Sequence, residues 1–373
     1  MEKRTVSKLD EFVRIFQLPP AMIPHIAFVA TEQEIDLVVG LNGNVMTLPQ
    51  VAEMLAMPHA EAEAFLQQAY YRQIVKRKTE DGVTTYSAHT FYRRLNPLSM
   101  YENWGDVPAD ARDAVIEWQL QEFINIWLPV VEELRNNPDA YVRIPNRDVL
   151  LLDEALEMVD AATEHVVVPC DCRAIVMACD RPLEACIRLD EGARRTLEMG
   201  HGRRLSRDEM KRLVVDADRA GLMHTGNRRW RQQGQLFGFC NCCACDCYPF
   251  RGGIKLGMSQ QWPRAHHIAE RDLTRCHMCG KCAQRCHFGA FFRDGTRVVV
   301  NDKKMRHVAF DPARCWDCGL CATGCPEGAI AMQPLPVSAA IDAASGAAET
   351  VVLSDQIRRM YDGYVEDRRK SHT

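Results

Sequence analysis

The chain has 373 residues, more than one typical domain, and its length predicts two or three domains. Hydrophobic residues make up 47% and charged residues 26%, as in ordinary soluble globular proteins. The net charge of −4 does not indicate binding to nucleic acid or to a membrane surface. Residues 1–30 lack a secretion signal and no stretch approaches about 18 uncharged apolar residues, so we expect a cytoplasmic chain without a membrane span.

Residues 31–95 predict three helices followed by a hairpin. Thr31 begins the first helix, and a capping box from Thr47 to Gln50, with a proline near the first helical position, begins the second. The third helix follows Pro58, and Glu80-Asp81-Gly82 forms the turn of the hairpin. The apolar stripe of the third helix consists of Ala62, Phe65, Leu66, Ala69 and Ile74. This order of elements resembles a winged helix-turn-helix domain.

The winged-helix resemblance implies DNA binding, which the charges disfavour. A reading helix contacts bases through its N-terminal residues, and here those include Glu61 and Glu63. Residues 1–95 hold ten Lys and Arg against eleven Asp and Glu, a net of −1, whereas DNA-binding modules normally carry a basic surface. We interpret the basic run of Lys76, Arg77 and Lys78 as side chains that are exposed to solvent and do not contact a DNA backbone. We expect this region to contact protein rather than nucleic acid.

A helical connector is predicted after this region, with a long helix over residues 109–136. Its apolar surface is wider than one stripe, so we expect it to be buried between domains or in a subunit contact. A second capping box, Ser206 with Glu209, predicts a helix that ends at Gly221. A basic group nearby either offsets cluster charge or forms a solvated face; it consists of Arg203, Arg204, Arg228, Arg229 and Arg231.

Nine cysteines gather in the middle of the chain, whereas residues 1–169 contain none. The first group is Cys170, Cys172, Cys179 and Cys186, and the second is Cys240, Cys242, Cys243, Cys245 and Cys247. Two further [4Fe–4S] clusters would use eight of these thiols; one cluster together with a zinc ion is the alternative, and His201 is a conceivable extra ligand. Either each group fills one site or the two groups interleave. On a strand we expect the two thiols of a C-x-C to point apart. The loops that carry them must therefore either turn or supply ligands to two separate metal sites.

Eight more cysteines form two copies of one spacing, C-x2-C-x2-C-x3-C. They are Cys276, Cys279, Cys282 and Cys286, then Cys315, Cys318, Cys321 and Cys325, the last followed by Pro326. Three cysteines at this spacing wrap a loop around three corners of a cubane, and the fourth cysteine of each run ligates the other cluster. Zinc, which binds pairs of C-x2-C, fits four evenly spaced thiols badly. The first predicted cluster is therefore bound by Cys276, Cys279, Cys282 and Cys325, and the second by Cys315, Cys318, Cys321 and Cys286.

The sequence repeat extends beyond the ligands at a constant offset, so that Arg275 before the first run matches Arg314 before the second. Residues 270–334 thus resemble the bacterial-type two-cluster ferredoxins, with all eight ligand positions present. Two departures are His287, where a proline usually follows the fourth cysteine, and Trp316 with Asp317 inside the second loop. Either is expected to alter hydrogen bonding and solvent access at the clusters, and so their potentials. Residues 291–300 predict a hairpin with an Asp-Gly turn.

The predicted fold class is α+β. The predicted domains are a winged-helix-like domain at 1–95, a helical connector at 96–165, a cysteine-rich metal or iron–sulfur region at 166–269, a two-cluster ferredoxin domain at 270–336, and a linker with a tail helix at 337–373. The arrangement resembles winged-helix iron–sulfur proteins that accompany larger redox enzymes.

This resemblance implies an electron-transfer subunit, in a hetero-oligomeric complex, that passes single electrons to or from an oxidoreductase partner such as a flavoprotein. No dinucleotide fingerprint or catalytic triad stands out, so no residue is predicted to be catalytic and the chain itself is not expected to be the catalytic subunit. Two alternatives stay open: a redox-sensing transcriptional regulator, and a reductase with its own open-site cluster.

Overall fold

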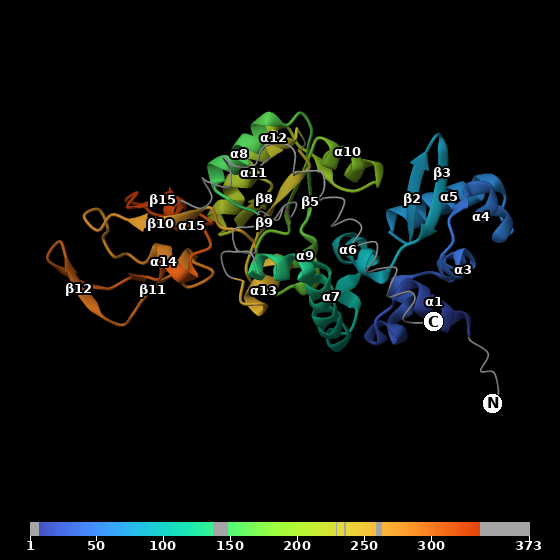
Figure 1. Ribbon diagram of the computed structural model, residues 1–373, viewed down its shortest axis with the longest axis horizontal. Coiled ribbons are helices and arrows are strands. Elements are labelled where there is room, and N and C mark those ends of the chain that lie inside the picture. Colours follow the sequence, from blue (N-terminus) through green and yellow to red (C-terminus); the bar gives the residue numbers. More distant parts are fainter. Residues whose placement is uncertain (1–6, 137–147, 229, 235, 259–262, 336–373) are drawn as a thin grey trace.

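A computed structural model of the protein describes the structure of residues 7–136, 148–228, 230–234, 236–258 and 263–335. Helices and strands are mixed along the chain, as expected for an α+β protein. Three parts follow one another along the long axis of the molecule: N-terminal helices with a hairpin, a central sheet with its helices, and a small C-terminal part (Figure 1). The predicted linker and tail helix at 337–373 lie outside the described residues.

The N-terminal part contains the three helices and the hairpin expected for residues 31–95. Its elements are α1 (Lys8–Phe16), η1 (Pro20–His25), α2 (Ile26–Val29), α3 (Glu32–Leu41), β1 (Met46–Thr47), α4 (Leu48–Met54), α5 (His59–Tyr71), β2 (Val75–Glu80) and β3 (Val83–Ala88). Thr31 caps α3 by a reciprocal capping box with Glu34, because each satisfies a backbone N–H that the helix leaves free. The strands form an antiparallel sheet in the order β1-β3-β2.

The connector continues with α6 (Phe91–Tyr101), η2 (Trp104–Asp106) and α7 (Ala109–Asn136), the last with the bounds predicted for the long helix. Phe123 and Ile124 of α7 belong to a core that begins at α1 and reaches Ile175 and Tyr248 of the central part. The wide apolar surface of α7 is therefore explained by burial between two parts of the same chain, as one of the two expectations had it.

A six-stranded antiparallel sheet forms the centre of the molecule, in the order β4-β8-β9-β6-β5-β7. The elements here are β4 (Asp148–Leu150), α8 (Leu152–Ala161), β5 (His165–Pro169), α9 (Asp171–Val176), β6 (Glu184–Leu189), α10 (Glu191–Glu198), β7 (Arg203–Arg204), α11 (Arg207–Arg219), β8 (Met223–Gly226), α12 (Trp230–Gln233), β9 (Gly238–Cys242) and α13 (Tyr248–Lys255). The predicted connector is thus not helical throughout, because its β4 pairs with β8 and α8 packs on the sheet.

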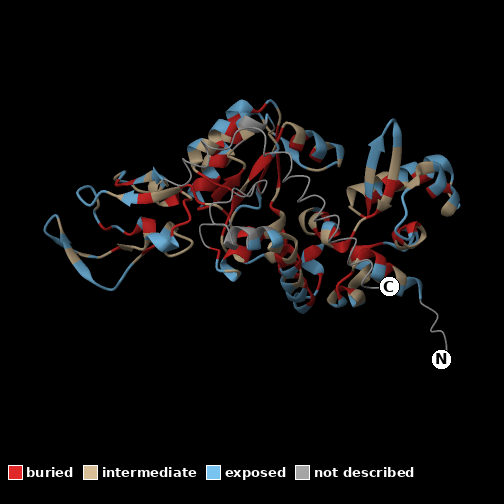
Figure 2. Cartoon of the chain, viewed as in Figure 1, coloured by how far each residue is buried: buried red, intermediate tan, exposed pale blue. Residues whose placement is uncertain are grey.

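Helices α8 and α11 cover one face of this sheet, and their apolar side chains pack on Ile187 and Phe239. α11 begins at the predicted capping box of Ser206 and Glu209, and Gly221 just beyond its end has a φ of +80°. Burial is densest in this sheet, whereas the two hairpins at the ends of the molecule are largely exposed (Figure 2).

The other face of the sheet carries thiols. Phe239 of β9 packs against the helices, so Cys240 and Cys242 share the opposite face, because residues two apart on a strand point the same way. The expectation that C-x-C thiols diverge on a strand was therefore wrong. The pair that diverges is Cys242 and Cys243, which are adjacent and lie in different clusters of buried side chains.

The basic group near the sheet is engaged in ion pairs with acidic neighbours. Arg228 contacts Glu154 at 2.8 Å and Arg231 contacts Glu157 at 2.8 Å. The remaining described pairs are Arg203 with Glu184 at 2.7 Å and Arg204 with Glu164 at 3.5 Å. Arg203, Arg204 and Arg231 are more than half exposed, which agrees with the solvated-face interpretation, whereas Arg228 is partly buried. Arg229 lies outside the described residues.

The C-terminal part is closed by the antiparallel pair of β10 and β15. Its elements are β10 (His267–Arg271), α14 (Lys281–Arg285), β11 (Phe291–Phe292), β12 (Arg297–Val300), β13 (Lys303–Arg306), β14 (Ala309–Phe310), η3 (Pro312–Arg314), α15 (Leu320–Thr323) and β15 (Ile330–Pro334). No helix among the described residues is long and apolar enough to cross a membrane.

The hairpin predicted within residues 291–300 was wrong. β11 pairs with β14, and β12 pairs with β13 instead. The hairpin turn is Asn301-Asp302, at φ of 50° and 60°, which fits the right-handed twist of the strands, whereas Asp294 hydrogen-bonds Thr296 and His307 and so turns the chain out of β11.

Candidate metal centres

Two ligand loops of the C-terminal part repeat the same backbone. Met278 and Asp317 stand at matching positions and are the non-glycine residues of the loops with left-handed φ, 53° and 63°. The next left-handed positions, Gly280 at 82° and Gly319 at 72°, begin the short helices α14 and α15. Since both loops bend at matching positions, they present their first three thiols in the same way.

The fourth thiol of each run accepts a backbone hydrogen bond. Ala290 donates to Cys286 Sγ at 3.2 Å, and Ala329, at the matching position of the second run, donates to Cys325 Sγ at 3.3 Å. Such N–H···S bonds stabilise negative charge on a thiolate and tune the potential of a bound cluster.

The four thiols predicted for the first cluster surround one cavity. Cys276, Cys279, Cys282 and Cys325 all line it, together with apolar side chains of Met278, Val308 and Ile330. Burial raises the pKa of Cys282 to about 11, so this thiol ionises at neutral pH only with a cation beside it. A cavity ringed by four convergent thiols fits a [4Fe–4S] cubane, one thiolate to each iron corner.

The four thiols predicted for the second cluster also gather, in a more buried place. Burial raises the pKa values of Cys315, Cys318 and Cys321, and a negative charge on Cys286 raises all three further. Because the charge of Cys286 acts on all three of these thiols, Cys286 lies among the cysteines of the second run. The assignment of Cys286 to the second cluster requires this position. A bound iron would offset this cost, because a coordinating thiol is deprotonated outright.

The departures from the ferredoxin pattern lie where the C-terminal part meets the central sheet. Trp316 is buried, with its ring 4.3 Å from that of Phe288 and 5.0 Å from that of Phe250 on α13. Asp317 accepts hydrogen bonds from the backbone of His266 at 2.5 Å and the ring of His267 at 3.1 Å. These residues fasten the second ligand loop to the segment that leads from the central part.

His287 also fastens the C-terminal part to the central part. Its Nε2 contacts the carbonyl oxygen of Gly221 at 2.7 Å, just beyond the end of α11. Arg285 of α14 reinforces the contact by donating to the carbonyl and carboxylate oxygens of Asp218, at 2.8 and 3.1 Å. A proline at position 287 would lack this ring, so the departure marks a docked ferredoxin-like part rather than a free one.

The nine thiols of the central part divide into six and three. Six of them interact with their neighbours in a closed ring in the order Cys170, Cys172, Cys247, Cys242, Cys240, Cys186 and back to Cys170. The register of β6 and β9 sets Cys186 directly opposite Cys240, with their sulfurs 3.8 Å apart. Thiols from 170–186 and 240–247 therefore interleave, one of the alternatives that the sequence left open. We call this set the six-thiol ring.

Charge is shared unequally around the six-thiol ring. Hydrogen bonds from Cys172 and Cys186 lower the pKa of Cys170 well below its usual value, although burial opposes the shift. Burial raises the pKa of Cys247, but hydrogen bonds from Cys172 and Cys242 lower it more, to about 5. Cys170 and Cys247 are thus the two of these thiols that lose their protons most readily, as binding to a metal requires.

The six-thiol ring needs positive charge nearby, and Arg188 of β6 supplies some of it. Burial would lower the pKa of Arg188, but the charges of Cys186 and Cys240 raise it. Arg188 therefore stays charged beside the ring, and no cysteine spacing could have indicated it.

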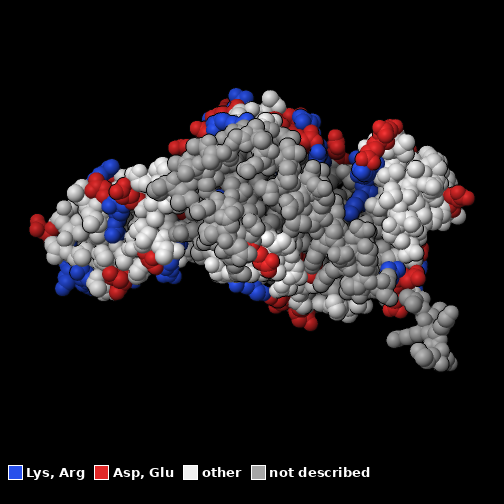
Figure 3. All heavy atoms as spheres, viewed as in Figure 1, with Lys and Arg blue, Asp and Glu red and all other residues white. Residues whose placement is uncertain are grey.

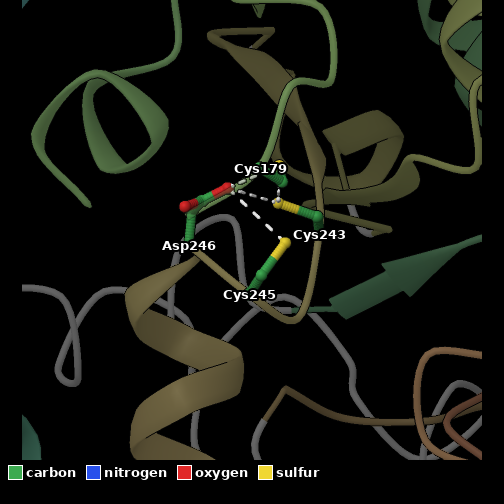
Figure 4. Close-up of side chains that lie close together, drawn as sticks. All are labelled: Cys179, Cys243, Cys245 and Asp246. Atoms are coloured by element: carbon green, nitrogen blue, oxygen red, sulfur yellow. Dashed lines mark hydrogen bonds between the residues drawn. The ribbon is translucent and has the colours of Figure 1, made fainter. Parts of the chain in front are cut away.

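The remaining three thiols lie together with a carboxylate. Cys179, Cys243, Cys245 and Asp246 place their ligand atoms within 4.8 Å of one another, and Asp246 points its carboxylate at all three sulfurs (Figure 4). Asp246 was not predicted from the sequence, because an aspartate between two cysteines looks like any surface acid. The predicted extra ligand, His201, instead stacks on Tyr101 and contacts the carbonyl of Tyr71 at 2.9 Å.

Residues 275–329 match the family model of the 4Fe-4S dicluster domain, which contains all eight cysteines of the duplicated run. An iron–sulfur segment is therefore established, and with the cysteine-rich centre it indicates a redox function. No curated protein and no solved structure matches this chain. The match covers the C-terminal part alone, so the six-thiol ring and the N-terminal part are interpreted from their own residues.

Proposed function

We propose that this protein passes single electrons through a series of iron–sulfur centres to or from a larger oxidoreductase partner. The observation that carries the proposal is a shared core between the second ferredoxin loop and the six-thiol ring. Trp316 and Leu320 pack in one cluster of buried side chains with Cys242 and Cys247, and Cys318 packs against it. A centre held by the ring would thus lie close to the second cubane, as electron transfer between clusters requires.

The series has an exposed end and a buried end. Cys279 of the first cluster is exposed, whereas Cys318 of the second lies at the packed boundary with the ring. The first cluster is thus the place where a soluble partner gains access. The ring itself supplies six thiols, enough for one cubane with two to spare, so we favour one iron–sulfur centre there rather than the two expected from nine cysteines.

The surface beside the first cluster favours an acidic partner. The exposed β12–β13 hairpin carries Arg297, Lys303, Lys304 and Arg306, and Lys281 is exposed next to Cys279. Figure 3 shows several Lys and Arg side chains at this end of the molecule, interspersed with acidic ones. A flavoprotein or other oxidoreductase subunit with an acidic patch would be steered to this end.

Nucleic-acid binding finds no support at the predicted reading helix. Glu61 and Glu63 are exposed near the start of α5, where phosphates would approach. Arg77 contacts Gln67 at 2.9 Å and lies over the ring of Tyr70, and Lys78 pairs with Glu80 at 2.6 Å. The winged-helix-like part is proposed as a protein-contact module.

A second candidate function is a reductase in which the six-thiol ring holds a reactive centre. The surplus of two thiols over the four that a cubane needs favours it. The burial of Cys170, Cys186, Cys242 and Cys247 argues against it, because a substrate would have to reach the ring. Turnover of a substrate by the isolated chain would support this candidate.

The test of the electron-transfer proposal is iron and acid-labile sulfide per chain, with EPR of the reduced protein. We expect about twelve irons in the wild type, since a cubane holds four, with magnetic coupling between centres. Joint replacement of Cys172, Cys242 and Cys247 by Ala leaves three thiols in the ring, fewer than a cubane needs, and should retain about eight irons and lose part of the coupling. Cys325→Ala should instead lose irons of the first ferredoxin cluster. Eight irons in both the wild type and the triple variant, with unchanged EPR, would remove the ring from the series.

The partner surface is tested with a reduced acidic flavodoxin as the electron donor. Lys303→Glu combined with Lys304→Glu should slow reduction of the clusters about tenfold at low ionic strength, with the difference vanishing at high salt. Arg203→Glu on the central part is the matched control. Equal slowing by the control would show a non-local charge effect and no docking at the hairpin.

A further inference from the structure

The three thiols outside the six-thiol ring, with Asp246, form a group that the family match does not reach. Cys179 lies in the loop between α9 and β6, and Cys243, Cys245 and Asp246 lie in the turn between β9 and α13. Cys243 and Asp246 are buried, with 1% of each exposed. We call this group the Cys3Asp site.

The spacing within the Cys3Asp site matches one metal ion. Cys179 and Cys243 place their sulfurs 3.9 Å apart, and Asp246 Oδ2 lies 2.9, 3.1 and 3.6 Å from the sulfurs of Cys179, Cys243 and Cys245. Tetrahedral Zn²⁺ with Zn–S bonds of about 2.3 Å sets its sulfurs about 3.8 Å apart. The site also offers four ligand atoms, the number that one tetrahedral Zn²⁺ takes.

A hydrogen-bonded group without metal explains the geometry less well. Asp246 Oδ1 already accepts the backbone N–H of Ala178 at 2.9 Å, so all three thiols converge on the single oxygen Oδ2. Three donors exceed the two lone pairs of one carboxylate oxygen. One cation among the four atoms satisfies them all, and the bond from Ala178 then orients the carboxylate, as outer-shell partners of metal ligands do.

Charge near the Cys3Asp site matches a divalent ion as well. Three thiolates, one carboxylate and M²⁺ sum to −2. Arg173 lies 3.4 Å from Cys243 Sγ and 3.7 Å from Asp246, and Arg181 lies 3.5 Å from Cys245 Sγ. The two guanidinium groups offset that charge, and Arg173 is itself buried, so its position is defined by the site.

We propose that Cys179, Cys243, Cys245 and Asp246 bind one Zn²⁺ in a closed tetrahedral site. Thiolate-rich sites of this shape select zinc over the hard cations, which prefer oxygen ligands. With four protein ligands the ion has no open position, so its role is structural. Its ligands Cys245 and Asp246 stand between Cys242 and Cys247, so the ion holds in place the turn that supplies two thiols of the six-thiol ring. This site does not depend on the proposed electron-transfer function.

Zinc bound to the full-length, anaerobically purified protein is measured by mass spectrometry after dialysis against a chelator. We expect one zinc per chain in the wild type, at least tenfold less in Asp246→Ala and Cys179→Ala, and full retention in Asp246→Cys, which keeps four ligands. Asp180→Asn, an exposed acid beside Cys179, is the matched control and should retain its zinc. The iron of the ferredoxin clusters reports in every variant that the chain has folded.

X-ray absorption at the zinc edge of the wild type tests the ligand set without any substitution. Three sulfur scatterers at about 2.3 Å and one oxygen at about 2.0–2.2 Å are expected, becoming four sulfurs in Asp246→Cys. Loss of about four irons, and no zinc, from Cys179→Ala would overturn the proposal in favour of a cubane. Unchanged zinc and iron in both ligand variants would overturn it in favour of hydrogen bonding alone.

Discussion

Asp317 shows how one side chain within a ligand loop can bind two parts of a protein together. It is 1% exposed and accepts from the backbone of His266 and the ring of His267, at the start of the C-terminal part. At the matching position of the first loop stands Met278, which lines the first cluster instead. The two loops have the same backbone conformation, but only the second is docked against the segment that leads from the central part. The difference lies in side chains that are not cluster ligands.

Replacing Asp317 with Asn should weaken this docking. The side-chain amide would place an N–H donor opposite the donor of His266 or His267 and leave that group unsatisfied. A buried unsatisfied group costs about 1–3 kcal/mol. The free energy of unfolding, measured by anaerobic urea titration, should fall by that amount. Asp302→Asn is the control, because Asp302 is exposed in the hairpin turn and Asn tolerates its left-handed backbone. Equal stability of Asp317→Asn and the wild type would contradict the docking role.

Arg94 is a buried charge that joins α6 to α2. Its side chain is fully buried, donates to the carbonyl of Val29 at 2.8 Å and pairs with Glu102 at 2.6 Å. Arg94→Ala should destabilise the protein by about 1–3 kcal/mol, because the carbonyl oxygen of buried Val29 loses its donor, whereas Glu102 is partly exposed and keeps Arg72 as a partner. Thermal unfolding of the N-terminal part measures the loss, and a shift below about 1 kcal/mol would show that the pair is not needed.

The same pair predicts a pH dependence. Burial raises the pKa of Glu102, but hydrogen bonds and charge from Arg94 and Arg72 lower it more, so its folded pKa is below its usual value. The stability it contributes is therefore present near neutral pH and is lost as pH falls through the acid range. Glu102→Gln should flatten that acid branch of the unfolding curve, and an unchanged acid branch would contradict the assignment.

At the scale of elements, the ligand loops depend on glycines with left-handed backbone. Gly280 begins α14 at a φ of 82°, and a methyl group there would overlap the guanidinium of Arg293, which donates to the carbonyl of Cys279 at 2.9 Å. Such a methyl group would displace the exposed Arg293 side chain and its hydrogen bond to the first ligand loop. Gly295 has a similar φ, 85°, with open space around it.

Gly280→Ala should therefore disturb the first cluster more than backbone strain alone explains. We expect slower cluster reconstitution and up to about four irons lost from the purified protein, whereas Gly295→Ala should retain full iron because it suffers the strain without the overlap. Iron per chain and visible absorption measure both variants. Equal iron loss in the two would assign the effect to strain and not to the ligand loop.

At the scale of the whole molecule, the parts are fastened by shared cores. The N-terminal core extends to Ile175 and Tyr248, and the ferredoxin-like part contributes Trp316 and Leu320 to a core with Phe250. The proposed order of the centres, from exposed first cluster to buried ring, is thus held by side chains that belong to different parts. Relative motion of the parts would have to open these cores.

A fragment of residues 264–336 tests this arrangement. It should keep about eight irons, because all eight predicted ligands and the β10–β15 pair lie inside it, but it should bind an apolar dye and self-associate once Trp316 and Leu320 are uncovered. Full-length protein is the control and should bind little dye. A fragment without iron would show that the central part is needed to form the clusters.

The sequence by itself determined the duplicated cysteine run, the capping boxes and the bounds of the long helix. These are local patterns: three cysteines lie within one loop, and caps and stripes follow the helical period. It also singled out His287, Trp316 and Asp317 as departures, without their purpose. The hairpin at 291–300 failed, because β11 and β12 each pair with strands further along the chain.

Only the tertiary structure decided how the nine central cysteines divide. Their partners come from segments far apart in the chain, and the register of β6 on β9 sets Cys186 against Cys240. That register depends on Gly238, where any side chain would meet the backbone of Ile187. Asp246 became a candidate ligand only because folding brings Cys179 to it. Spacing reveals ligands that share a loop; ligands from distant segments become visible only when strand pairing brings their atoms together.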